Sequence, residues 1–227
     1  MTPLLYESAP YIYYHNDADT FNRQTGDEDR SSFGARLWGK LGPARIDYSF
    51  ILQTGNFQNK PIHASTLQTR TAVSLSSKKA SPEISLQFDY ASGGPRNGSS
   101  SGTYNPIYPG NEYVSINAFM VPANLVDVSP GVLLPITHKL GLELIHRWYW
   151  RYSVQDAVYG RDFATIGASL NTSARFVGTQ PSADIRWDAT PNLEVRLSGG
   201  RFQPTSAFQA AGLKAVNNLN LFLTFMY

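Results

Sequence analysis

Every second side chain from Leu219 to Tyr227, at the end of the chain, is apolar or aromatic. Leu219, Leu221, Leu223 and Phe225 fall on one side of an extended strand, and the residues between them fall on the other side. A strand of about ten residues, tilted across a bilayer, spans its hydrocarbon layer. A soluble β-sandwich contains strands with the same alternation, so this segment alone leaves both architectures open.

The same pattern predicts nine further strands and therefore ten strands altogether. The connections that it predicts alternate between long and short along the chain. The predicted strands cover about residues 10–16, 33–41, 44–53, 66–75, 83–90, 126–136, 139–152, 175–188, 193–198 and 217–227. The longer connections are 17–30, 55–62, 93–123, 153–172 and 202–216, and the short turns are 42–43, 78–81, 137–138 and 190–192.

This sorting of the connections is typical of bacterial outer-membrane barrels, which have short periplasmic turns and long external loops. A soluble sandwich has no reason to sort its loops in this way. The sequence therefore predicts an all-β, antiparallel, up-and-down transmembrane β-barrel in the bacterial outer membrane. Residues 1–227 form one domain in this interpretation, both termini lie on the periplasmic side, and residues 113–121 add a short helix.

Composition supports a barrel that is apolar outside and polar inside. The chain has thirteen Tyr, twelve Phe and four Trp, yet only 16% of its residues are charged. The longest apolar runs, such as 132–136, are far below the roughly 18 residues that a membrane helix needs, so strands must do any spanning. The first residues lack the basic and apolar regions of a signal peptide, so we expect that they are not one. Either a leader is missing from this sequence, or the chain is the C-terminal portion of a longer protein.

Charge and residue usage exclude several classes of protein. The net charge is +2 and no long basic run is present, so nucleic acid is not an expected partner. Cysteine is absent, which removes disulfide scaffolds and thiolate metal sites. No pair of histidines has ligand spacing, and we expect neither a metal nor another cofactor.

The side of each predicted strand opposite the apolar one carries nearly balanced charges. Among the inward basic residues, we expect Arg147, Arg151, Arg186 and Arg196 to be presented together and to attract an anionic solute. The plainer alternative is that acids and bases pair across strands around a wet lumen. If the turns are regular, Arg70 lies opposite Asp89 and is occupied by it, and Asp127 lies opposite Arg147. Asp47 is a further lumenal acid.

An outer-membrane hydrolase is the alternative from the enzyme class. It would need a serine and a histidine within hydrogen-bond reach on one rim. The alternation turns His146 toward lipid, and His138 falls in a turn, without an acid spaced to orient either one. We therefore expect no catalytic residues. A structural barrel with a plugged lumen is a third possibility, and conductance would separate it from a pore.

Several short motifs resemble the C-terminal part of the alginate export family of outer-membrane porins. They are residues 30–39 (RSSFGARLWG), 47–48 (DY), 52–55 (LQTG), 88–93 (FDYASG), 105–109 (NPIYP), 148–152 (WYWRY), 175–178 (RFVG) and 200–202 (GRF). The resemblance implies an arginine-rich channel that passes a polyanionic polysaccharide or a small solute. It implies that Arg36, Arg45, Arg147 and Arg151 form the basic constriction.

The resemblance also raises the question of barrel size. Members of the family are similar to an eighteen-stranded barrel, whereas ten strands are predicted here. The chain is therefore either part of a larger barrel or a small closed barrel. In a small closed barrel, the side chains would largely fill the lumen. The expected partners are the outer-membrane bilayer, an anionic polysaccharide or small anion, and periplasmic export machinery.

Overall fold

The computed structural model describes residues 5–21, 24–76, 80–95, 97–107, 119–160 and 163–226. Ten strands form one antiparallel sheet in which every strand pairs with its neighbours in sequence, as predicted. The strands are β1 (Leu5–Phe21), β2 (Gln24–Leu41), β3 (Ala44–Phe57), β4 (Lys60–Ser74), β5 (Glu83–Ala91), β6 (Leu125–Pro135), β7 (Leu140–Arg151), β8 (Phe176–Thr190), β9 (Leu193–Pro204) and β10 (Val216–Phe225).

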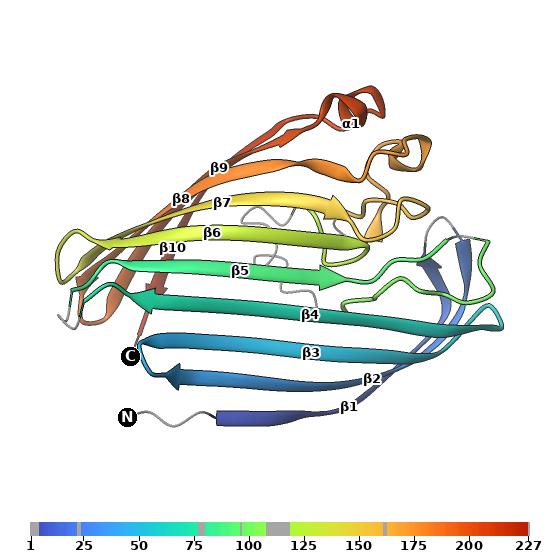
Figure 1. The fold of residues 1–227 in the computed structure, drawn as a ribbon, viewed down its shortest axis with the longest axis horizontal. Helices are drawn as coiled ribbons and strands as arrows, with labels where there is room; N and C mark the ends of the chain where they lie inside the picture. The colour runs from blue at the N-terminus through green and yellow to red at the C-terminus, as the bar shows by residue number, and fades with distance from the viewer. Residues whose placement is uncertain are drawn as a thin grey trace.

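The sheet is strongly curved, and β8, β9 and β10 pass behind the middle strands in Figure 1. Strands β1 and β10 are its two edges, and the sheet is not closed into a ring, which is consistent with part of a larger barrel. Strand β1 begins and β10 ends at the left of Figure 1, where β2 turns into β3, β4 into β5, β6 into β7 and β8 into β9; we call this the tight-turn end. The turn from β3 to β4, at Gln58 and Asn59, is also short but lies at the other end. The long connections lie at the opposite end. We call the concave side the lumenal face.

Side-chain alternation places the apolar residues on the convex face, as predicted. Leu221 is 63% exposed and Phe50 is 39% exposed, although both are large apolar side chains. The ladder keeps this face continuous, because Phe33 pairs with Leu52 and Ile185 pairs with Leu197. The described residues contain no second sheet that covers it. The convex face therefore has the apolar surface that a barrel presents to lipid, and the sandwich alternative is wrong.

The first four strands are longer than predicted. Residues 17–30 and 55–62 were expected to form loops, but β1 and β2 pair as far as Phe21 and Gln24, and β3 and β4 pair as far as Phe57 and Lys60. Strand β2 has 18 residues, roughly twice the number needed to span a bilayer. Its convex face is polar at Ser31, Asp29 and Asp27, because this part extends beyond the hydrocarbon and no longer needs apolar side chains there.

Two tight turns follow from backbone preferences. Gln58 and Asn59 both have positive φ, of 49° and 62°, as the central residues of a type I′ hairpin turn require. Gly42 has a φ of 60° in the turn from β2 to β3, where glycine adopts this conformation without a steric cost.

The described parts of the remaining long connections pack against the loop end of the lumenal face. Residues 92–124, 152–175 and 205–215 link β5 to β6, β7 to β8 and β9 to β10, and they include η3 (Ser169–Asn171) and α1 (Ser206–Ala210). Phe208 of α1 and Phe202 of β9 are fully buried in one apolar cluster. The helix expected at 113–121 begins outside the described residues. Tyr227 also lies outside them. No helix in the described ranges is long and apolar enough to cross a membrane.

Candidate functional site

Exposed arginines on the lumenal face pair with carboxylates of other strands, and one of the pairs reaches across an intervening strand. On β2, Arg36 donates two hydrogen bonds to Asp47 of β3, with N–O distances of 2.8 and 2.7 Å. Arg45 of β3 donates to Glu83 of β5, at 2.8 and 3.3 Å. Two-bond geometry orients a guanidinium more firmly than a single contact does. These pairs match the cross-strand alternative from the sequence, and Arg36 and Arg45 both lie on the lumenal face.

The far side of the lumenal face has the same arrangement. Arg196 of β9 donates to Asp184 of β8 at 2.7 Å. Arg186 of β8 lies 2.7 Å from Glu194 and 3.6 Å from Asp188. The side chains of Arg186 and Arg196 are 62% and 40% exposed. Both arginines therefore remain accessible from the lumen even though each has an acidic partner.

Arg70 does not pair with Asp89, so this prediction was wrong. Arg70 lies opposite Gln87, because the ladder between β4 and β5 is shifted by two residues from the expected register. Its guanidinium instead forms an ion pair with Glu143 of β7. This pair passes over β5 and β6, so it joins two strands that are not neighbours in the sheet. Asp89 accepts a hydrogen bond from the backbone N–H of Thr69, at 2.9 Å.

The pairing predicted for Asp127 was also wrong by two residues. Asp127 lies opposite Tyr149, and on its other side it faces Asp89. Arg147 interacts electrostatically with both carboxylates and donates to the Ser182 hydroxyl at 2.9 Å. All three charged groups are buried. Since like charges placed opposite each other destabilise a sheet, Arg147 offsets this repulsion and is not open to the lumen.

Arg151 has a structural environment and not the open lumenal position that was expected. Its side chain is fully buried at the end of β7, where the connection to β8 folds around it. The guanidinium donates to the backbone carbonyls of Val154, Asp156, Ser169 and Thr172, at distances between 2.7 and 3.1 Å, and also to that of Ala174. Arg151 and Arg147 are therefore not presented beside Arg186 and Arg196.

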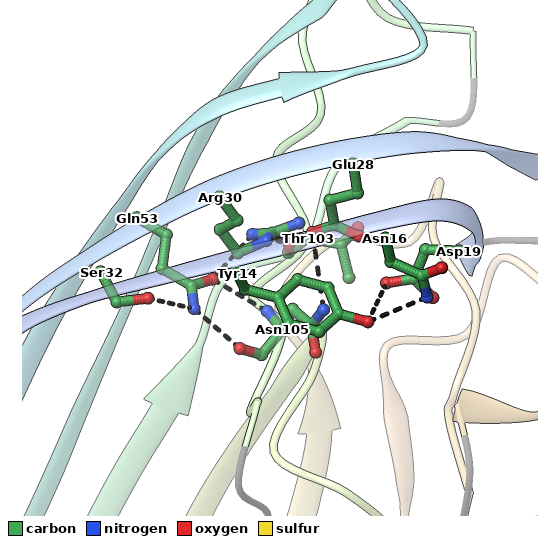
Figure 2. Close-up of polar contacts among 9 residues, drawn as sticks. All are labelled: Tyr14, Asn16, Asp19, Glu28, Arg30, Ser32, Gln53, Thr103 and Asn105. Atoms are coloured by element: carbon green, nitrogen blue, oxygen red, sulfur yellow. Dashed lines mark hydrogen bonds and ion pairs between the residues drawn. The ribbon is translucent and has the colours of Figure 1, made fainter.

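A buried polar cluster, which the sequence analysis missed, attaches the β5–β6 connection to the lumenal face (Figure 2). Glu28 and Arg30 form an ion pair with fully buried side chains. Arg30 also donates to Gln53 at 2.7 Å and to the Thr103 carbonyl at 3.3 Å. The Gln53 side chain in turn bonds both the N–H and the C=O of Asn105, at 2.9 and 2.7 Å.

The sequence contained one signal that could have revealed this cluster. Arg30, Gln53 and Asn105 each belong to a different motif among those that resemble the porin family. The structure brings the three motifs into contact. Alternation could not do so, because Arg30 lay in a predicted loop and Asn105 lies in a segment without periodicity.

A buried carboxylate connects the two longest connections to each other. Asp156 accepts hydrogen bonds from the Gly94 N–H at 3.0 Å and the Thr103 hydroxyl at 2.6 Å. It also accepts from the Ala157 N–H at 2.8 Å and the Tyr159 hydroxyl at 2.7 Å. Burial raises the pKa of Asp156, while these four donors act in the opposite direction. The carboxylate thus fixes Gly94 and Thr103 against the β7–β8 connection.

A family model described as alginate export matches residues 6–222, which is nearly the whole chain. The chain belongs to the alginate export family. This is a family of outer-membrane porins and not of enzymes. No curated protein matches the chain.

For a member of the alginate export family, an antiparallel sheet with an apolar convex face fits a polysaccharide porin of the outer membrane. The described residues include no group of three or more His, Asp or Glu that could hold a metal. His146 lies on the convex face beside Trp148, with ring centroids 4.4 Å apart. His15 contacts Asp17 and Asp29, both at 2.9 Å, and no serine is among its described partners.

Proposed function

We propose that the chain forms the wall of an outer-membrane channel that passes an anionic, alginate-like polysaccharide or small anionic solutes along an arginine-rich lumenal face. The observation that supports this proposal most directly is the row of exposed lumenal arginines. Arg36, Arg45, Arg186 and Arg196 have side chains between 40% and 62% exposed, each beside an acidic partner.

Exposed ion pairs can exchange partners with a passing anion. An exposed pair contributes only about 0 to 1 kcal/mol, so a carboxylate of the solute can replace the protein's own carboxylate at little cost. The acids keep the wall close to neutral, which prevents a polyanion from binding too tightly to leave. Arg147 and Arg151 are buried, and in this proposal they support the wall and do not touch the solute.

Conductance in planar bilayers tests the proposal. We expect ion-conducting events and, under a salt gradient, a reversal potential that indicates anion preference. Replacing Arg36 and Arg196 together with Gln should reduce this preference. The control is Arg201→Gln, which removes one positive charge from the convex side of β9 and is compared with the single variants Arg36→Gln and Arg196→Gln. Equal anion preference in the double variant and the wild type would refute the role of the arginines.

A non-conducting structural barrel is the second candidate. It is favoured by the contacts of the β5–β6 connection with Arg30 and Gln53, which hold a loop on the lumenal face. Loops that fold inward can plug a barrel. If the inserted protein passes no current, this candidate replaces the channel.

A further inference from the structure

A hollow on the lumenal face, near the tight-turn end of β2, β3 and β4, has the composition of a sugar subsite. Its volume is about 470 Å³, and its lining includes Trp38, Lys40, Asp47, Arg70 and Ala72. This volume falls within the range of ordinary ligand pockets. The hollow combines an aromatic ring with charged groups, and none of the roles considered above uses Trp38 or Lys40.

The Trp38 ring is held in place before any ligand arrives. The guanidinium of Arg36 lies over the ring, 5.1 Å from its centroid. That guanidinium is itself fixed by its two hydrogen bonds to Asp47, the residue opposite Trp38 in the ladder. A ring fixed by its neighbours loses little conformational entropy on binding.

Lys40 supplies positive charge that no described acid offsets. Asp47 pairs with Arg36, Arg45 pairs with Glu83 and Arg70 pairs with Glu143. No ion pair involves Lys40 among the residues that the structure describes. Its side chain is exposed, and it follows Trp38 by two positions, so both point to the lumenal face.

We propose that this hollow binds one hexuronate residue of a polysaccharide, with the sugar ring on Trp38 and its carboxylate at Lys40. A pyranose ring has an apolar C–H surface that packs on an aromatic face and hydroxyls that bond to charged groups at its rim. Ala72 lies opposite Arg45, and its short side chain leaves room for the ring. This inference rests on the proposed channel function, and it specifies the class of sugar that one part of the channel wall binds.

Block of the channel current by sugars tests the subsite. A short alginate oligosaccharide is compared with a neutral malto-oligosaccharide of the same length. Lys40→Gln should weaken block by the uronate about fivefold, since an exposed charge pair contributes up to about 1 kcal/mol. Block by the neutral sugar should not change. Lys139→Gln, the matched control in the β6–β7 turn, should leave both unchanged.

The aromatic half of the subsite has its own variants. Trp38→Ala should weaken block by both sugars, and Trp38→Phe should retain most of it, because a ring remains. Trp187→Ala on the convex face is the control. If Lys40→Gln and Lys139→Gln weaken block by the uronate equally, Lys40 acts only through the general electrostatic potential of the lumen. That result would overturn the subsite. Block of the Trp38→Ala channel at the wild-type sugar concentration would also overturn it.

The test separates this inference from the proposed function. A channel that conducts but is not blocked by the oligouronate disproves the subsite alone. A protein that does not conduct disproves the channel, and calorimetric titration of the oligouronate into the detergent-solubilised protein then tests the subsite with the same variants. Loss of binding in Lys40→Gln but not in Lys139→Gln would support it, and equal binding in all three proteins would overturn it.

Discussion

Replacing Arg151 with lysine should loosen the connection between β7 and β8 without changing the charge of the protein. Arg151 is fully buried, and its five N–H groups donate to five backbone carbonyls. A lysine ammonium has three donors on a single atom. At least two of the five carbonyls therefore lose their partner.

The magnitude follows from the cost of an unpaired buried group, which is about 1 to 3 kcal/mol. Two such groups cost about 2 to 6 kcal/mol, and a value near 3 kcal/mol increases the population of the opened loop by about 100-fold. Arg186→Lys is the matched control. Arg186 is 62% exposed and pairs with two carboxylates, so its replacement should cost no more than about 1 kcal/mol.

Limited proteolysis measures this opening. The protein in detergent is treated with chymotrypsin, and mass spectrometry follows cleavage within residues 152–175. When the loop opens and closes faster than it is cut, the cleavage rate tracks the opened population. We expect Arg151→Lys to be cut much faster than the wild type, and Arg186→Lys to be cut at the wild-type rate. An unchanged rate in Arg151→Lys would show that the carbonyl contacts do not hold the loop.

Three further substitutions have defined outcomes. Asp156→Asn leaves two of the four donors around the carboxylate without an acceptor, so it should cost about 2 to 6 kcal/mol. Amide exchange at Gly94 should become faster, and wild-type exchange would contradict this. Leu221→Arg should impair insertion by about 2 to 4 kcal/mol, measured by urea-dependent folding into vesicles. Asn220→Arg, on the lumenal side, should cost less, and equal costs would refute the assigned faces. Gly55→Ala should lower the urea midpoint of unfolding, because the residue has a φ of 141° and a Cβ there would lie 1.9 Å from the Asp29 carbonyl oxygen. Gly141→Ala is the control, since its Cβ would meet nothing closer than 3.8 Å. Equal midpoints would contradict the clash.

Alternation predicted the faces of the sheet but not its register. Arg70 was expected opposite Asp89 and lies opposite Gln87, and Asp127 was expected opposite Arg147 and lies opposite Tyr149. Both errors are shifts of two residues. A shift of one residue would turn the apolar side chains inward, whereas a shift of two keeps every side chain on its face. The hydrophobic pattern therefore cannot detect it.

The candidate site was predictable only in part for the same reason. The inward positions of Arg36, Arg45, Arg186 and Arg196 follow from alternation alone. The burial of Arg151 depends on a connection that folds back over the end of its strand, and such loops carry no periodicity. The Glu28–Arg30 pair was missed because β2 continues into water, where the convex face no longer has to be apolar.

The ion pair between Arg70 and Glu143 has a mechanical consequence. It connects β4 with β7 across the concave side of the curved sheet, so flattening the sheet would pull the two groups apart. Both side chains are partly exposed, at 41% and 22%, and salt weakens such a contact. The bore of the assembled pore should thus widen slightly as ionic strength rises.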